Sequence, residues 1–277
     1  MKKIKDSSVN NVLVSIVTIV LNGEDHIEQT INSVINQTYK RIEYIIIDGG
    51  STDDTIKIIE RYKDRINIFV SKPDNGIYDA INKGISYVNG SLVGLIHCGD
   101  YYEPDAVSNA INAYLRTEAD VIYGDLRIIE NEGSEKVVRI QKSKHKDLKN
   151  RMSISHPATF ISRNCYQKYG LYDCKYKLAA DYDFILKLFL ADARFHYINK
   201  ILANFRAGGL SGTDSKLSMR ENVTIRKNHL GNIYSIKYAI MRTVRDYYFS
   251  RRKLIIQKCI GKRYYSRMKQ IYYELMH

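Results

Sequence analysis

The chain has 277 residues, of which 44% are hydrophobic and 26% are charged, with 43 Lys and Arg against 30 Asp and Glu. This length and composition suffice for a buried core and exclude a mainly disordered chain. The net charge of +13 favours an acidic partner, with nucleic acid, an anionic membrane and a polyphosphate substrate as the candidates.

The first half of the chain alternates apolar runs with helical patterns. Residues 13–21 form a continuous run rich in β-branched side chains, typical of a strand buried on both faces of a parallel sheet. Such alternation argues for βαβ units, and therefore for a parallel sheet with helices on both faces. It predicts further strands at 42–47, 66–70 and 92–96, and helices with apolar faces at Ile27, Ile31, Val34 and Ile35, at Ile56, Ile59 and Tyr62, and at Ile77, Ile81, Ile85 and Val88.

Three sequence features predict where helices begin. Ser51 and Asp54 form an S-x-x-D capping pattern before the second helix, and Asp74 is placed to cap the third. Pro104 suits the first turn of a fourth helix.

The alternation becomes irregular after residue 115. Strands are predicted at 120–130, 157–162 and 194–207 and a helix at 178–190, whereas residues 130–149 are polar and charged. From about residue 213 the pattern is helical, and residues 237–277 hold eleven Lys and Arg against two acids, a net charge of +9. The sequence therefore predicts an α/β protein of three parts, 1–115, 116–212 and 213–277.

The cysteines and the N-terminal residues bear on location. Cys98, Cys165, Cys174 and Cys259 lack the spacing of zinc ligands, which favours a reducing cytosol. Residues 1–11 lack the apolar stretch of a signal peptide, and no run is long enough to span a membrane. We expect a cytoplasmic protein that is soluble or bound peripherally to the inner face of the cell membrane.

Polar residues follow the ends of the predicted parallel strands. They are Asn22, residues 48–51, residues 71–75 and Asp100. In doubly wound sheets, ligands bind in the crevice beyond the carboxyl ends of the strands. These clusters are therefore predicted to face one binding crevice.

Seven stretches between residues 12 and 212 carry a family resemblance: 14–22 (VSIVTIVLN), 33–38 (SVINQT), 44–53 (YIIIDGGSTD), 71–84 (SKPDNGIYDAINKG), 99–100 (GD), 156–160 (HPATF) and 179–183 (AADYD). Together they resemble glycosyltransferase family 2, the inverting nucleotide-sugar transferases with a GT-A fold. The resemblance implies transfer from a nucleotide-diphosphate donor, a UDP-sugar, to a hydroxyl of a glycan or polyprenyl-linked acceptor in bacterial surface polysaccharide synthesis. Residues 1–115 would bind the donor and residues 116–212 the acceptor.

The resemblance also implies a pocket for the donor base. Asp48 would accept an N–H of the base, although Asp-Gly-Gly-Ser is also good turn chemistry. The backbone around Thr18 and Val20 would line the pocket with Asn22, and Leu21 would supply an apolar wall.

Two residues of the third predicted helix are assigned to the ribose and phosphates by the same resemblance. These are Asp79 and Lys83, which lie four residues apart. That spacing equally suits a plain surface ion pair.

A metal ligand is implied at Asp100. A D-x-D-like motif is usual at this point of the fold, but this chain has only Gly99 and Asp100 in a His-Cys-Gly-Asp sequence. Asp100 is then the sole side-chain ligand for Mn²⁺ or Mg²⁺, with diphosphate oxygens completing the shell. The alternative is an Asp near the start of a helix.

Helical spacing separates two further carboxylates. Asp181 shares a face with Phe184, Ile185 and Leu188, so it heads the buried stripe, whereas Asp183 is predicted to face Lys187 in solvent. The resemblance makes Asp181 the catalytic base, with a helix cap as the alternative.

Two residues are weaker candidates on the acceptor side. They are His156, which precedes Pro157, and Asp183. An isolated His is more often structural than functional.

The basic tail after residue 236 interleaves Lys and Arg with apolar and aromatic side chains. This pattern favours a helix on an anionic membrane, with a cap that packs on the domain as the alternative and nucleic acid binding as the least favoured. Because the first carboxylate of the metal motif is missing, a non-catalytic nucleotide-binding or scaffolding protein remains the alternative function.

Overall fold

The structure is a computed structural model that describes residues 12–132, 135–207, 215–233 and 240. Its strands are β1 (Val14–Val20), β2 (Ile42–Asp48), β3 (Ile68–Ser71), β4 (Leu92–Leu95), β5 (Tyr101–Tyr102), β6 (Val121–Glu132), β7 (Glu135–Gln141), β8 (Thr159–Ser162) and β9 (Phe195–Arg206). Its helices are α2 (Ile27–Ile35), α3 (Thr55–Glu60), α4 (Ile77–Ser86), α5 (Ala106–Thr117), α6 (Arg163–Tyr169), α7 (Ala180–Leu190) and α8 (Ser215–Leu230). Short 3₁₀ helices lie at Lys63–Arg65, His145–Asp147 and His156–Ala158.

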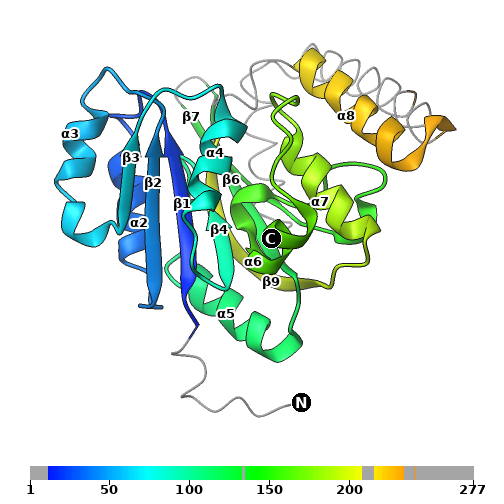
Figure 1. Ribbon diagram of the computed structural model, residues 1–277, viewed down its shortest axis with the longest axis horizontal. Coiled ribbons are helices and arrows are strands. Elements are labelled where there is room, and N and C mark those ends of the chain that lie inside the picture. The colour runs from blue at the N-terminus through cyan, green and yellow to red at the C-terminus, as the bar shows by residue number, and fades with distance from the viewer. Residues whose placement is uncertain (1–11, 133–134, 208–214, 234–239, 241–277) are drawn as a thin grey trace.

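The strands within the described ranges form one sheet, ordered β3-β2-β1-β4-β8-β6-β9-β5, with β7 paired to β6 (Figure 1). The four strands from β3 to β4 are parallel, and their register aligns Val20 with Asp48 and Asp48 with Ser71. The carboxyl ends of β1, β2 and β3 therefore meet at one edge of the sheet. Farther along the sheet β8 is antiparallel to both β4 and β6, whereas β6 and β9 are parallel.

Two apolar cores lie on opposite faces of the sheet. Helices α4, α6 and α7 cover one face, and α2, α3 and α5 cover the other. Both faces of β1 and β2 are buried because their runs of Val and Ile meet helices on each side. The predicted α/β class with helices on both faces is confirmed.

The structure adds elements that the sequence pattern did not predict. Strand β7 lies in the charged stretch 130–149, where it pairs with β6, and Arg139 forms an ion pair of 2.7 Å with Glu130. A strand with one neighbour tolerates charged side chains, so its pattern lacks the apolar alternation of a buried strand. Strand β5 and helix α6 are too short to give a clear period.

Two predicted helix caps are wrong. Ser51 bonds to Asp48 instead of capping α3, whose cap position is Asp54. The cap position of α4 is Gly76, at φ 113°, and Asp74 accepts a hydrogen bond from the Gly76 amide at 2.8 Å. Asp74 therefore shapes the turn before the helix.

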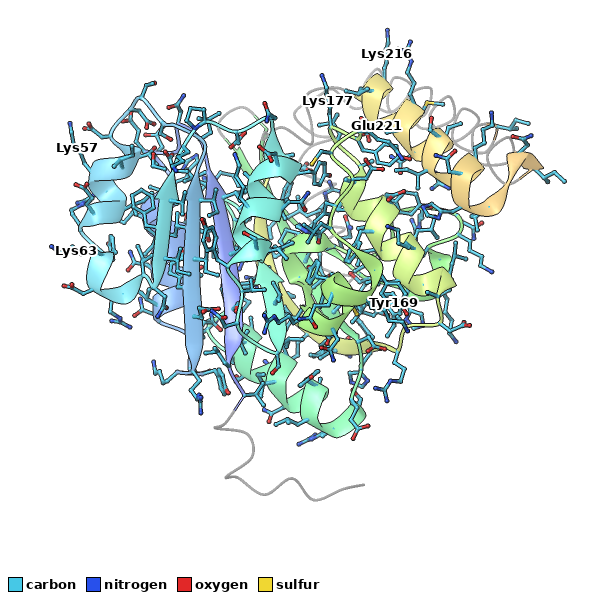
Figure 2. The ribbon with its side chains drawn as sticks, viewed as in Figure 1. Lys57, Lys63, Tyr169, Lys177, Lys216 and Glu221 are labelled. Atoms are coloured by element: carbon cyan, nitrogen blue, oxygen red, sulfur yellow. The ribbon has the colours of Figure 1, made fainter. Side chains whose placement is uncertain are left out.

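Helix α8 packs against α7 and is hydrogen-bonded to the segment that precedes α7 (Figure 2). The Glu221 carboxylate accepts hydrogen bonds from the amides of Lys177 and Leu178 at 2.7 and 2.9 Å. Arg226 is fully buried, lies 4.8 Å from the centre of the Tyr182 ring and donates to the carbonyl of residue 150 at 2.9 Å. The predicted helical extension is thus confirmed for Ser215–Leu230, whereas the basic tail after residue 236 lies, apart from Ile240, outside the described residues.

Replacement of Arg226 by Met is expected to lower the free energy of unfolding by about 3 kcal/mol, because buried carbonyls lose their donor. Lys227→Met is the control, since Lys227 is exposed on the same helix. The measurement is urea unfolding of the full chain. Equal stability of the two variants would contradict a role for Arg226 in fastening α8.

No helix in the described ranges has both the length and the apolar character needed to cross a membrane.

Candidate active site

Asp48 ends β2 at the edge where the parallel strands meet. Its carboxylate accepts hydrogen bonds from the Gly50 amide at 3.1 Å, the Ser51 amide at 3.0 Å and the Ser71 hydroxyl at 2.6 Å, and also from the Ser51 hydroxyl. The residue has no exposed surface. These bonds engage both oxygens in the turn after β2. The expectation that Asp48 accepts an N–H of a base stays a prediction.

Asn22 closes the same turn from the end of β1. It has φ 49°. Its side-chain oxygen accepts from the Thr52 amide at 2.8 Å, and its backbone amide donates to the Ser51 hydroxyl at 2.8 Å. Asn22 is exposed and lies beside the turn of Asp48, and its place in a donor pocket stays a prediction.

Two other predicted pocket residues lie inside the sheet. Thr18 is fully buried with its hydroxyl 3.1 Å from that of Tyr44, and the Val20 carbonyl accepts from the Gly49 amide at 2.9 Å. Contacts inside the sheet thus engage the Thr18 hydroxyl and the Val20 carbonyl. The Thr18 side chain therefore has no exposed surface, and the expectation that the backbone around Thr18 and Val20 lines a donor pocket stays a prediction.

Asp79 and Lys83 form the ion pair that their spacing allows. The Lys83 ammonium lies 3.0 Å from the Asp79 carboxylate and donates to the Pro73 carbonyl at 3.2 Å. Asp79 also accepts from the Asn75 amide at 2.9 Å. The pair therefore braces the loop that follows β3, next to the crevice.

Asp100 lies at the end of a tight turn. Gly99 has φ 97° and donates its amide to the Thr30 hydroxyl at 3.1 Å, and that hydroxyl donates to the Asp100 carbonyl at 2.8 Å. The Asp100 carboxylate accepts from the Arg206 amide at 3.1 Å. Burial nevertheless raises the pKa of Asp100 to about 7, with Arg206 opposing the shift.

The donor set around Asp100 fits a metal ion that arrives with a diphosphate. In the described part of the chain no three His, Cys, Asp or Glu side chains cluster closely enough to hold an ion. Mg²⁺ and Mn²⁺ are commonly bound through one or two carboxylates together with substrate phosphates. A desolvated carboxylate with a raised pKa gains a favourable charge partner when such a cation binds.

Asp181 is the second carboxylate with a raised pKa. It begins α7, where its Oδ1 accepts from the Tyr78 hydroxyl at 3.2 Å and from the Tyr182 amide at 2.8 Å. Burial raises its pKa to about 6, although both hydrogen bonds oppose the shift. A carboxylate with this pKa is charged at neutral pH and well matched to accepting a proton.

The predicted surroundings of Asp183 are wrong. Asp183 is buried and its Oδ1 lies 2.8 Å from His229 Nε2 of α8. Lys187 instead lies over the ring of Phe184 and near the Tyr169 carbonyl. Asp183 therefore bonds to α8, and its expected place on the acceptor side stays a prediction.

A series of rings connects the turn that holds Asp100 to Asp181. The rings of His97 and His156 are 5.3 Å apart, and His156 Nε2 lies 3.4 Å from the Tyr172 hydroxyl. Tyr172 stacks on Tyr78 at 5.9 Å, and Tyr78 donates to Asp181. Burial lowers the pKa of His97 to about 3 and that of His156 to about 4, so both rings are neutral at physiological pH.

Sequence reasoning missed Tyr78 and Tyr172. The Asn82 side chain holds the backbone of Tyr172. Its oxygen accepts from the Tyr172 amide at 3.0 Å, and its nitrogen donates to the Tyr172 carbonyl at 2.8 Å. Tyr78 was detectable, because it shares a helical face with Ile81 and Ile85 and is as buried as a core residue. Tyr172 lies in a loop without a period and gave no signal.

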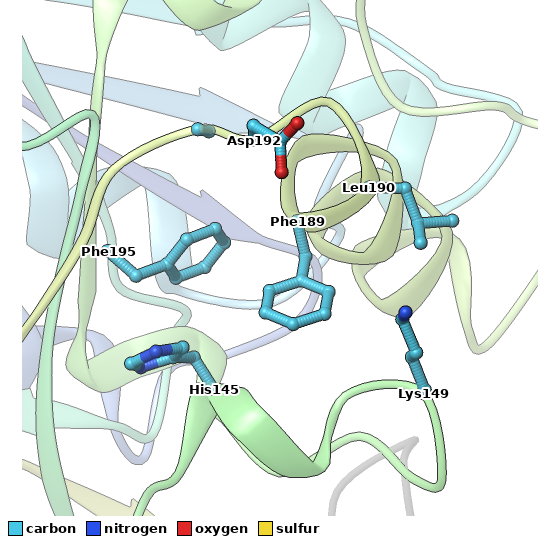
Figure 3. Close-up of a pocket in the computed structure, with 7 residues that line it drawn as sticks. His145, Lys149, Phe189, Leu190, Asp192 and Phe195 are labelled. Atoms are coloured by element: carbon cyan, nitrogen blue, oxygen red, sulfur yellow. The ribbon is translucent and has the colours of Figure 1, made fainter.

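A separate cavity of about 290 Å³ lies near the opposite end of α7 (Figure 3). Rings of His145, Phe189 and Phe195 face it. Phe189 is eight residues beyond Asp181, about 12 Å along the helix. The cavity has neither Asp100 nor Asp181 in its lining, so we regard the region of these two carboxylates as the candidate active site.

A mostly parallel α/β sheet with one buried carboxylate after β4 and another with a raised pKa in the first turn of α7 is typical of ligand-binding enzymes. Residues 15–174 match the family model described as Glycosyl transferase family 2. The chain belongs to this family and is a glycosyltransferase.

Its relatives agree with this assignment. It is 33% identical over 183 residues to an uncharacterized glycosyltransferase of Mycobacterium tuberculosis, an alignment that spans 63% of this chain and 68% of the relative. It is also 31% identical over 233 residues to the hyaluronan synthase of Pasteurella multocida, which covers 82% of this chain but 23% of that protein.

Solved structures share the fold at low identity. TarS 1–349 of S. aureus in complex with UDP-GlcNAc has a TM-score of 0.64 at 18% identity, over 80% of this chain and 69% of that one. The mannosyltransferase PcManGT from Pyrobaculum calidifontis in complex with GDP-Man and Mn²⁺ has a TM-score of 0.55 at 14% identity, over 83% and 64%. The predicted GT-A fold is confirmed.

Proposed function

We propose that the protein is an inverting transferase that moves a sugar from a UDP-sugar to a hydroxyl of a glycan acceptor. The supporting observation is the desolvated Asp181 carboxylate, held by Tyr78 and joined through stacked rings to the turn of Asp100. One carboxylate is suited to the diphosphate side of the reaction and the other to the acceptor side.

The chemistry assigned to Asp181 is general base catalysis. The acceptor oxygen attacks the anomeric carbon, the bond from that carbon to the diphosphate breaks, and the acceptor proton moves to an Asp181 oxygen. In-line attack inverts the anomeric configuration. The pKa of about 6 leaves Asp181 charged before the step and basic enough to take the proton.

Asp100 would hold Mn²⁺ or Mg²⁺, which when bound supplies positive charge opposite the leaving diphosphate. Asn22 and the pair of Asp79 and Lys83 are proposed to border the donor, because they brace the loops after β1 and β3. His156 is proposed to lie on the acceptor side through its contact with Tyr172.

The wider setting is part of the same proposal. Residues 1–115 bind the donor, residues 116–212 the acceptor, and residues 213–277 contact an anionic membrane at its cytoplasmic face. The net charge of +9 on residues 237–277 supports the membrane contact. Relatives named hyaluronan synthase and chondroitin synthase support a glycan acceptor in surface polysaccharide synthesis. If the acceptor glycan is lipid-linked, a polyprenyl group would carry it.

The rate of sugar release from the donor is expected to fall about tenfold per pH unit below about pH 6, because protonated Asp181 accepts no proton. Tyr78→Phe removes a hydrogen bond that lowers this pKa, so the midpoint should move to higher pH. The measurement is a pH profile of nucleoside diphosphate release in saturating Mn²⁺.

Tyr166→Phe is the matched control for that profile. Tyr166 is a buried tyrosine whose hydroxyl lies 3.3 Å from that of Tyr172, and no hydrogen bond joins it to Asp181 in the described structure. The midpoint of the pH profile of Tyr166→Phe should equal that of the unmodified protein. Superimposable profiles for Tyr78→Phe and the unmodified protein would remove Asp181 as the base.

A further inference from the structure

Helix α7 begins without a side-chain cap of its own. Its cap position is Ala179, whose methyl group cannot accept a hydrogen bond. Backbone amides at the start of a helix have no partners inside the helix, and polar groups nearby usually satisfy them. Asp181 lies in the first turn of α7, so its position depends on contacts that other elements make with the backbone leading into the helix.

Helix α8 makes such contacts through one buried carboxylate. Glu221 is 8% exposed, and its Oε1 accepts from the Lys177 amide at 2.7 Å while its Oε2 accepts from the Leu178 amide at 2.9 Å (Figure 2). Two turns farther along α8, Asn228 donates to the Tyr176 hydroxyl at 3.2 Å. Glu221 therefore fixes the backbone three and four residues before the proposed base.

Helix α4 holds the same region from the other side. The Asn82 side chain bonds to the backbone amide and carbonyl of Tyr172, where the segment before α7 begins. Tyr78 of the same helix donates to the Asp181 carboxylate at 3.2 Å. Asp181 is thus held through its side chain by α4 and through its preceding backbone by α8.

The titratable groups around Asp181 come from α4, from the segment before α7, from α7 itself and from α8. They are Tyr78, Tyr172, Glu221 and the pair of Asp183 and His229. Burial is the main cause of the raised pKa of Asp181; the Tyr78 hydrogen bond opposes it, and the negative charge of Glu221 adds to it. Tyr78 and Glu221 therefore act on Asp181 in opposite directions.

We propose that Glu221 is a positioning residue for the base, which fixes the backbone from which α7 begins and places a negative charge that acts on Asp181. This assignment rests on the proposed function and adds to it a residue that does not touch the substrate. It also gives α8, which lies beyond the residues 15–174 matched by the family model, a part in the reaction.

The test is the pH profile of nucleoside diphosphate release by Glu221→Gln, in the full chain and in saturating Mn²⁺. Glutamine keeps the size of the side chain and one acceptor oxygen, but it removes the charge and turns an amino group toward the second amide. The midpoint should move to lower pH by roughly 0.5 unit, opposite to the shift in Tyr78→Phe. The maximal rate should fall roughly tenfold because the base is less well placed. Affinity for UDP, measured by calorimetry, should stay within about twofold.

Two variants separate the charge of Glu221 from its hydrogen bonds. Glu221→Asp keeps the charge on a shorter side chain, so it should lower the maximal rate and leave the midpoint in place. Asp192→Asn removes a charge from an exposed residue just beyond the other end of α7 and should change neither quantity.

The outcomes distinguish this assignment from the proposed function. A midpoint in Glu221→Gln equal to that of the unmodified protein, or an equal shift in Glu221→Asp, would overturn the assignment of Glu221 and leave Asp181 as the base. Loss of UDP binding in Glu221→Gln would also overturn it, because the carboxylate would then serve only to keep the chain folded. If Asp181→Asn retains the full rate of release, the proposed base is wrong and the assignment of Glu221 falls with it.

Discussion

Asp181→Asn is expected to reduce sugar transfer by about 10³-fold while the donor still binds, because an amide cannot accept the acceptor proton. The substitution keeps the size of the side chain and leaves an oxygen to accept from Tyr78 and the amide of residue 182. Release of nucleoside diphosphate measures the transfer, and calorimetry with the same nucleotide sugar measures the binding.

The same variant should unfold less readily at neutral pH. Folding raises the pKa of Asp181 from 3.8 to about 6, so the folded state binds the proton more tightly. Stability from this group is therefore present at low pH and is lost as the pH rises through about 6. Asp181→Asn avoids that loss and should add about 3 kcal/mol at pH 7.5 but nothing at pH 3.5.

Asp192→Asn is the control, since Asp192 is an exposed carboxylate just beyond the other end of α7. It should change neither transfer nor stability. Loss of transfer together with loss of donor binding in Asp181→Asn would indicate a damaged site instead of a missing base. Unchanged transfer would rule out Asp181 as the base.

Asp100→Asn is expected to abolish the effect of Mn²⁺ on donor binding and to reduce transfer by at least about 10²-fold. The reason is that Asp100 is a buried carboxylate whose raised pKa shows that its charge is poorly solvated, so a bound cation would stabilise it. Calorimetry with UDP, in Mn²⁺ and separately in EDTA, gives the metal-dependent part of the affinity directly.

The comparison has a nearby control. Asp105→Asn removes an exposed carboxylate at the start of α5, five residues farther along the chain, and should keep the difference between Mn²⁺ and EDTA. If Asp100→Asn and the unmodified protein gain equally from Mn²⁺, the metal does not bind at Asp100.

The meeting of the carboxyl ends of β1, β2 and β3 at one edge could be predicted from the sequence, because it follows from parallel strand pairing alone. Parallel strands place their carboxyl ends at one edge, and the register joins Val20 to Asp48 and Asp48 to Ser71 as that rule requires. The burial of the α7 stripe, with Phe184 and Ile185 in the core, was equally readable from helical spacing.

The partners of single side chains could not be predicted, because they come from distant parts of the chain. Helical spacing predicts that Asp183 faces Lys187, yet Asp183 is buried and hydrogen-bonds with His229, which lies 46 residues away. Tyr78 reaches Asp181 across 103 residues. Local periodicity carries no information about such contacts. The turn of Asp48 is local instead, and its Asp-Gly-Gly-Ser sequence indicated it.

The most direct test of the central claim is a crystal structure of Asp181→Asn with a UDP-sugar and Mn²⁺. The account predicts that the side chain of residue 181 lies on the face of the anomeric carbon opposite the diphosphate, with Asp100 on the diphosphate side. A sugar bound with residue 181 on the diphosphate side, or with its anomeric carbon out of reach of residue 181, would contradict the account.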